Sequence, residues 1–191
     1  MKLAQNPLLS LVGFTHNYLV WEMFQGVRDF YKYRQLEKLI SDKVSWSEVY
    51  DIEDKLNKAV TVLEVDDNLK KARKWIKQAF KKTQKINKIL KKYYKKLFGI
   101  EYESPKSFEQ DRQQNKIYQQ IALELENTGS PLRIIRIIKE RIETSRSYSS
   151  DARNLGEARV SFEKIEPKVH ASISMVTIAE EMLNQLIVLL D

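Results

Sequence analysis

The sequence contains no cysteine, and glycine and proline are scarce, with 5 and 4 residues among 191. Without cysteine there are no disulfides, no thiolate metal ligands and no thiol nucleophiles, and the absence is neutral on localisation. Because glycine and proline end helices and shape tight turns, their scarcity predicts long helices joined by few loops.

The residue types that common enzyme sites need most are also few. His16 and His170 are the only histidines, and neither lies in an H-E-x-x-H pattern. Loops that hold nucleotide phosphates need several neighbouring glycines, whereas the nearest two here are Gly13 and Gly26. We therefore expect no metal, no cofactor, no small-molecule substrate and no enzymatic activity, and we interpret each histidine as an ordinary helix residue with a partly exposed ring.

The composition fits a soluble fold. Apolar residues make up 42% and charged residues 31% of the chain, which is too apolar for disorder and too charged for a membrane protein. Residues 172–190 are largely apolar, but Glu180 and Glu181 in their middle disfavour a membrane span. The opening MKLAQNPLLSLVGF makes a poor signal peptide, so a cytoplasmic location is favoured and export stays open if a leader has been removed.

Apolar residues recur at helical spacing along most of the chain. The clearest seam alternates steps of three and four from Leu69 to Leu97 and stops at Gly99, a C-cap candidate. This periodicity predicts an all-α, elongated antiparallel helical bundle of about six to seven segments. The isoleucine-rich segment at 131–146 leaves a strand as the alternative, and Pro167 is expected to break or kink the last segment. The predicted helices cover about 7–43, 45–66, 70–99, 107–127 and 131–146, followed, after a loop at 147–151, by a segment from 151 to the end.

We expect one domain over residues 1–191, with a sub-division into a long three-helix unit at 1–99 and C-terminal helices at 107–191. The main boundary signal is the stretch IEYESPKS at 100–107, in which Pro105 precedes a capping pattern.

Charge is segregated between two consecutive helices. Residues 45–67 hold seven acidic residues and two lysines, whereas residues 70–99 hold thirteen basic residues and no acidic one. If the two helices fold back about residues 66 and 67, position i faces roughly 133 − i, which places Asp51 beside Lys82 and Glu48 beside Lys85. The hairpin thus matches part of the charge, at only about 0 to 1 kcal/mol per exposed pair.

The basic helix extends beyond its acidic neighbour. The lysines from residue 88 onward, with Tyr94 among them, form the predicted contact patch, while Tyr93 falls on the apolar seam and is expected in the core. Because the whole chain carries +7 and this stretch +13, the rest carries −6, so the protein is a charge dipole suited to oriented docking. The patch comprises Lys88, Lys91, Lys92, Tyr94, Lys95 and Lys96.

Four interpretations of this charge are open. The basic residues form a solvated or internally matched face, a surface for an acidic protein, a site for nucleic acid, or a membrane-surface helix. Lysines and a tyrosine suit phosphates and an unpaired base, although arginine would recognise base edges better. The apolar seam of this helix would already be occupied inside the bundle, which argues against the interpretation as a membrane-surface helix.

The segments near the C-terminus contain more apolar residues than one buried face of a helix accounts for. Apolar surfaces of this kind are commonly covered by another chain. We predict partner-facing positions there, in an assembly or a homo-oligomer, against the alternative of a buried core helix in a monomer. These positions are Ile138, Leu183, Leu186, Ile187 and Leu190. The predicted function is a non-enzymatic scaffold or adaptor subunit that uses these faces and the basic patch, with a nucleic-acid-binding accessory protein as the alternative.

The segment LGEARVSFEKIEPKVHASISMVTIAEEMLNQLIVLL, residues 155–190, places a long amphipathic helix after a glycine-containing stretch. Together with long antiparallel helices, this resembles the helical minor-pilus subunits of conjugation and type IV secretion machines. The resemblance implies, as a further alternative, an exported subunit at a pilus tip or in a secretion complex.

Overall fold

A computed structural model describes residues 26–36, 46–66, 68–102 and 130–191, and all regular structure in these ranges is helical. The predicted all-α class is therefore confirmed. The predicted helix at 107–127 and most of the one at 7–43 lie outside the described residues. The described elements are a helix at 26–36, α2 (Trp46–Thr61), a short π-helical extension η2 (Val62–Asp66), α3 (Leu69–Phe98), α5 (Pro131–Glu157) and α6 (Phe162–Leu189).

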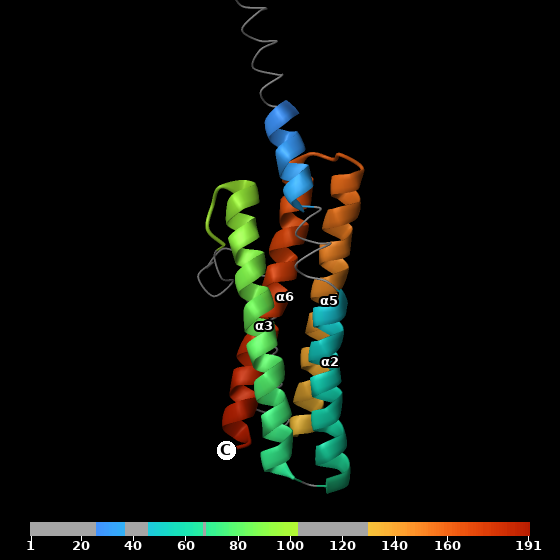
Figure 1. Ribbon diagram of the computed structural model, residues 1–191, viewed down its shortest axis with the longest axis vertical. Helices are drawn as coiled ribbons and strands as arrows, with labels where there is room; N and C mark the ends of the chain where they lie inside the picture. The colour runs from blue at the N-terminus through green and yellow to red at the C-terminus, as the bar shows by residue number, and fades with distance from the viewer. Residues whose placement is uncertain (1–25, 37–45, 67, 103–129) are drawn as a thin grey trace, which may run out of the picture.

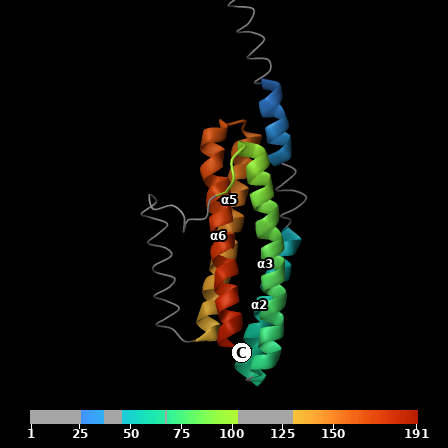
Figure 2. The same cartoon turned by 90° about the vertical axis from the view of Figure 1, so that its left-hand side faces the viewer.

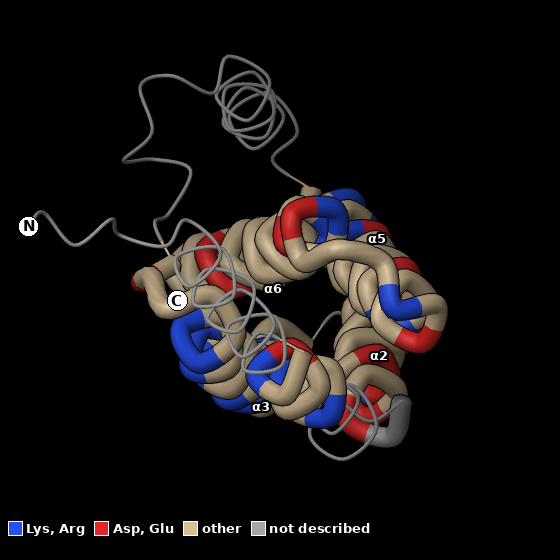
Figure 3. The backbone as a smooth tube through the Cα atoms, turned by 90° about the horizontal axis from the view of Figure 1, so that it is seen from above, with Lys and Arg blue, Asp and Glu red and all other residues tan. Residues whose placement is uncertain are grey.

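Four helices surround a common core in the order α2, α3, α6, α5, and neighbours in this ring run antiparallel (Figures 1 and 3). The packing between α5 and α6 is the most extensive and that between α2 and α5 the least. Residues 26–36 lie at the end of the bundle where α5 turns into α6 (Figure 1). The described helices form an elongated bundle in both side views (Figures 1 and 2).

The seam of α3 packs into the core nearly as its spacing predicts. Asn68 caps the helix by accepting a hydrogen bond from the Lys71 amide, and Gly99 ends it with φ of 75°, a conformation that glycine adopts without steric cost. Leu69, the first residue of α3, is half exposed. The buried seam comprises Ala72, Ile76, Ala79, Thr83, Ile86, Leu90, Tyr94 and Leu97.

The predicted loop at 147–151 is wrong, because α5 continues through it to Glu157. Serine favours loops when its hydroxyl competes with the backbone, but here the hydroxyls have tertiary partners. The Ser145 hydroxyl donates to the carbonyl of Ser172 at 2.9 Å, and the hydroxyls of Ser149 and Ser172 are 2.7 Å apart. These contacts with α6 make the serines compatible with a buried helix face.

The predicted break at Pro167 is also wrong, since α6 runs from Phe162 to Leu189 with this proline inside it, whereas the alternative of a kink stays a prediction. Pro167 lies near the start of the helix and is exposed. The carbonyl that lacks its helical partner is that of Glu163, in the first turn. Only this one helical hydrogen bond is lost, and the helix continues on both sides of it.

The C-terminal positions predicted to face a partner lie instead in the chain's own core. Ile138, Leu183, Leu186 and Leu190 are buried, and Ile187 is half-buried against the same cluster. The reason is that α6 packs extensively against both α5 and α3, and each of residues 172–179 is buried. By length and composition α6 could also cross a membrane, and 67% of its most apolar window is buried inside the bundle.

Two leucines of α6 test this assignment because they have the same chemistry and different burial. Leu186 is 0% exposed and Leu189 is 54% exposed. We expect Leu186→Ala to lower the free energy of unfolding by about 2–5 kcal/mol through reduced burial and a cavity, and Leu189→Ala to change it by at most about 0.5 kcal/mol. Urea denaturation gives both values. A Leu186→Ala protein with unchanged stability but an altered oligomeric state would restore the partner-facing interpretation.

Candidate functional site

The predicted hairpin between the acidic and basic helices is present with the predicted register. Lys82 forms an ion pair with Asp51, and the Lys85 Nζ lies 2.8 Å from an Oε atom of Glu48. The hydrogen bond from Lys82, followed by that from Lys55, holds the pKa of Asp51 below its ordinary value, while the hydrogen bond to Glu48 raises the pKa of Lys85. The acidic helix therefore neutralises the edge of α3 that faces it.

The basic contact patch predicted at the end of α3 divides into two groups. Three of its lysines are engaged within the protein: Lys95 pairs with Glu101, Lys91 lies over the ring of Tyr102 at 5.3 Å, and Lys96 lies over that of Tyr93 at 5.6 Å. Lys88 and Lys92 are exposed and form no ion pair with any described carboxylate.

Tyr94 does not face solvent, which corrects the prediction made for it. It is 3% exposed, and its hydroxyl donates to Glu166 of α6 at 2.7 Å. Its ring packs near those of Tyr102 and His170. A straight α-helix drifts about 20° per heptad against a 3.5-residue repeat, so after three heptads the core position moves from Tyr93 to Tyr94. Tyr93 is only half-buried.

The larger basic surface is one that the hairpin argument missed. Counting every lysine as facing α2 overlooks those that the helical repeat turns to the opposite side. Spacings of three, four and seven residues align these lysines along the outer face of α3, about 33 Å from first to last. All are exposed, and among the described residues no carboxylate pairs with them. This lysine stripe consists of Lys70, Lys74, Lys77, Lys81, Lys88 and Lys92.

The lower part of the lysine stripe borders a shallow groove of about 350 Å³. Lys70, Lys74, Lys77 and Lys81 line it, together with Arg73 and Gln78. Seen along the bundle axis, basic residues gather on the outer side of α3 (Figure 3). The sequence signal that could have located this surface is the i, i+4, i+7, i+11 spacing from Lys70 to Lys81.

The other side of α3 carries polar contacts to α6 rather than a reactive site. Asn87 donates from its amide to Glu180 at 2.6 Å and accepts from Thr177 at 3.3 Å. The Tyr102 hydroxyl lies 3.0 Å from Ser174, and burial raises its pKa. These hydrogen bonds satisfy polar groups inside the bundle and fix the register of the two helices. In the described ranges no three His, Asp or Glu side chains lie close enough to hold a metal ion.

Comparison of the chain with protein-family models, curated proteins and solved structures gives no match.

The ion pair between Asp51 and Lys82 is expected to contribute to stability in a pH-dependent way. Because the folded pKa of Asp51 is lowered from 3.8, the contribution is present above that pH and is lost as the pH falls through the folded pKa. We expect Asp51→Asn to destabilise the protein at pH 7 by at most about 1 kcal/mol. The difference from the parent should shrink below pH 3.8, measured by urea denaturation at several pH values.

A double-mutant cycle provides the control. Asp51→Asn and Lys82→Gln should show a coupling energy of about 0.2–1 kcal/mol. Asp51→Asn with Lys88→Gln should show none, because Lys88 lies on the outer face of α3. Equal coupling in both pairs would contradict the hairpin register.

Proposed function

We propose that this protein is a non-enzymatic helical adaptor that docks onto a polyanionic partner through the lysine stripe of α3. One observation carries the proposal. Six exposed lysines form a straight line on a helix whose rotation is fixed by its buried seam, and no described carboxylate pairs with them. The stripe presents ammonium groups without a nucleophile or an acid–base pair. These groups are suited to binding anions rather than to catalysis.

The stripe costs folding stability, which supports a role in binding. Lys70 and Lys74, Lys77 and Lys81, and Lys88 and Lys92 are each four residues apart. Like charges at this spacing destabilise a helix by about 0.2–0.5 kcal/mol per pair. The acidic side chains of α2 could relieve such repulsion, but their described partners on α3 are Lys82 and Lys85 rather than the lysines of the stripe. A partner with complementary charge relieves it on binding.

Among polyanions, the stripe favours the phosphate backbone of double-stranded nucleic acid, which is the second candidate function. Lysines neutralise phosphates through counterion release without reading bases. Single strands need exposed aromatic rings for stacking, and Tyr94 is buried. A membrane-surface helix needs an apolar face to insert, and that face of α3 is buried in the bundle.

Neutralising part of the stripe tests the proposal. The triple variant Lys74→Gln, Lys77→Gln, Lys81→Gln should bind a 20-base-pair DNA duplex more weakly than the parent. The salt slope of log K should fall in magnitude by about 3, at about 0.9 for each phosphate that no lysine neutralises any longer. Its melting temperature should be equal or higher, because like-charge repulsion is removed and glutamine matches lysine in helix propensity. Fluorescence anisotropy and thermal denaturation measure the two effects.

A variant with the same reduction of net charge elsewhere is the control. Arg133, Arg136 and Lys164 are exposed and lie on α5 and α6. Their replacement by glutamine should leave the salt slope near that of the parent. Equal weakening by both triple variants would mean that net charge alone drives binding, and the stripe would lose its role. Tight binding of an acidic polypeptide with no binding of duplex would retain the adaptor proposal and remove the nucleic-acid candidate.

A further inference from the structure

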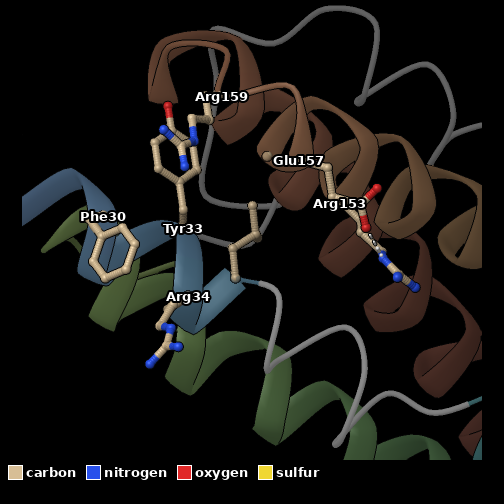
Figure 4. Close-up of a pocket in the computed structure, with 8 residues that line it drawn as sticks. Phe30, Tyr33, Arg34, Arg153, Glu157 and Arg159 are labelled. Atoms are coloured by element: carbon tan, nitrogen blue, oxygen red, sulfur yellow. Dashed lines mark hydrogen bonds and ion pairs between the residues drawn. The ribbon is translucent and has the colours of Figure 1, made fainter.

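A concavity separate from the lysine stripe lies between residues 26–36 and the end of α5 (Figure 4). Its volume is about 300 Å³, at the lower limit for small-molecule sites. Two chain segments about 120 residues apart build it, and they approach closely because residue 156 is glycine. A Cβ atom there would lie 2.8 Å from Leu36 Cδ2. The lining consists of Phe30, Tyr33, Arg34, Leu36, Arg153, Gly156, Glu157 and Arg159.

The cleft is positively charged, with three arginines and one glutamate in its lining. The glutamate, Glu157, accepts a hydrogen bond from Arg153 at 2.7 Å. Arg34 and Arg159 form no ion pair with any described residue, so their guanidinium groups keep unused donors. Guanidinium groups match the oxygen geometry of a phosphate better than ammonium groups do.

Aromatic rings lie beside the charged groups of the cleft. Phe30 is 51% exposed at the rim of the cleft, and the Arg34 guanidinium lies 5.6 Å from the centre of its ring. The Tyr33 hydroxyl donates to the carbonyl of Val160 at 2.6 Å, which joins residues 26–36 to the turn after α5. Arg159 lies beside Tyr33 (Figure 4). A planar ring can stack on such groups while an attached anion meets the arginines.

Arg159 lies in the turn that ends α5, in a left-handed backbone conformation. It is the only described residue other than glycine with positive φ, at 52°, a conformation that favours glycine. The hydrogen bond from its amide to the carbonyl of Gly156 and that from Val160 to Leu155 hold this turn in place. The two bonds form the Schellman pattern that commonly ends a helix, and they fix the position of Arg159 beside the cleft.

We propose that this cleft binds a small phosphate monoester carrying a planar ring, of the nucleoside monophosphate class, with the phosphate held by the positively charged lining and the ring against Phe30. Such a group can come from a free nucleotide or from the 5′ end of a nucleic acid. The site is separate from the lysine stripe and does not depend on it.

Isothermal titration calorimetry of the full chain tests the site with adenosine monophosphate, adenosine and inorganic phosphate. Adenosine monophosphate should bind, and adenosine should bind about tenfold more weakly or worse, the factor expected for removal of a charge-assisted hydrogen bond. Inorganic phosphate should also be weaker, since it lacks the ring. Equal affinity for adenosine and its monophosphate, or for phosphate and the monophosphate, overturns the proposal. Greater affinity for a 5′-phosphorylated oligonucleotide than for the same oligonucleotide without its 5′ phosphate supports it and assigns the source.

Two arginine variants separate a binding role from a structural one. Arg159→Gly removes the guanidinium and places the residue suited to positive φ, so it should lower affinity about tenfold while the melting temperature stays equal or rises. Arg153→Ala should weaken binding, whereas Arg136→Ala should not. Both are α5 arginines paired with a glutamate four residues later, and only Arg153 lines the cleft.

Unchanged affinity in both Arg159→Gly and Arg153→Ala would overturn the site. The variant with glutamine at Lys74, Lys77 and Lys81 should bind adenosine monophosphate like the parent, so that failure of the cleft and failure of the lysine stripe are distinguishable. Loss of nucleotide binding in that variant alone would place the nucleotide on the stripe and contradict the cleft.

Discussion

Burial of the α3 seam against α2 and α6 is the constraint on which the rest of the structure depends. The apolar residues from Ala72 to Leu97 need cover along one stripe, and two different neighbours provide it. Their packing fixes the rotation of α3 about its own axis, so the lysines on the remaining surface have no freedom to turn inward. The same rotation brings Asn87 and Tyr94 to α6, where Glu180 and Glu166 accept their hydrogen bonds. Charge, register and core thus follow from one packing arrangement.

The basic charge of α3 serves two purposes through two sets of lysines. Lys82 and Lys85 meet Asp51 and Glu48, where exposed ion pairs define register and add little stability. The lysine stripe repels itself and is left without described acidic partners. A sequence selected only for stability would intersperse both signs of charge along such a face. The retained repulsion is the physical reason to look for an external anion.

Local backbone preferences are also broken at the arginine cleft, and there too the conformational cost coincides with positive charge. Arg159 occupies a backbone conformation suited to glycine, while Gly156 is placed where a side chain would meet Leu36. The two residues lie in one turn and on one cleft. Departures from local preference concentrate at functional positions because the rest of the fold can offset them. The surrounding α5 and α6 core, held by the Ser145, Ser149 and Ser172 contacts, provides that support.

Sequence alone determined the helical class, the bounds of α3 and the pairing of Asp51 with Lys82, because helix period, caps and the short α2–α3 turn are local properties of the chain. Tertiary structure decided which apolar face is core. Leu183 and Leu186 are apolar, but their sequence does not say which surface buries them. In the structure the chain's own helices bury them. It also decided between Tyr93 and Tyr94, since the drift of the helix accumulates over many turns. The arginine cleft was beyond sequence reasoning, because its two walls meet only after the bundle has closed.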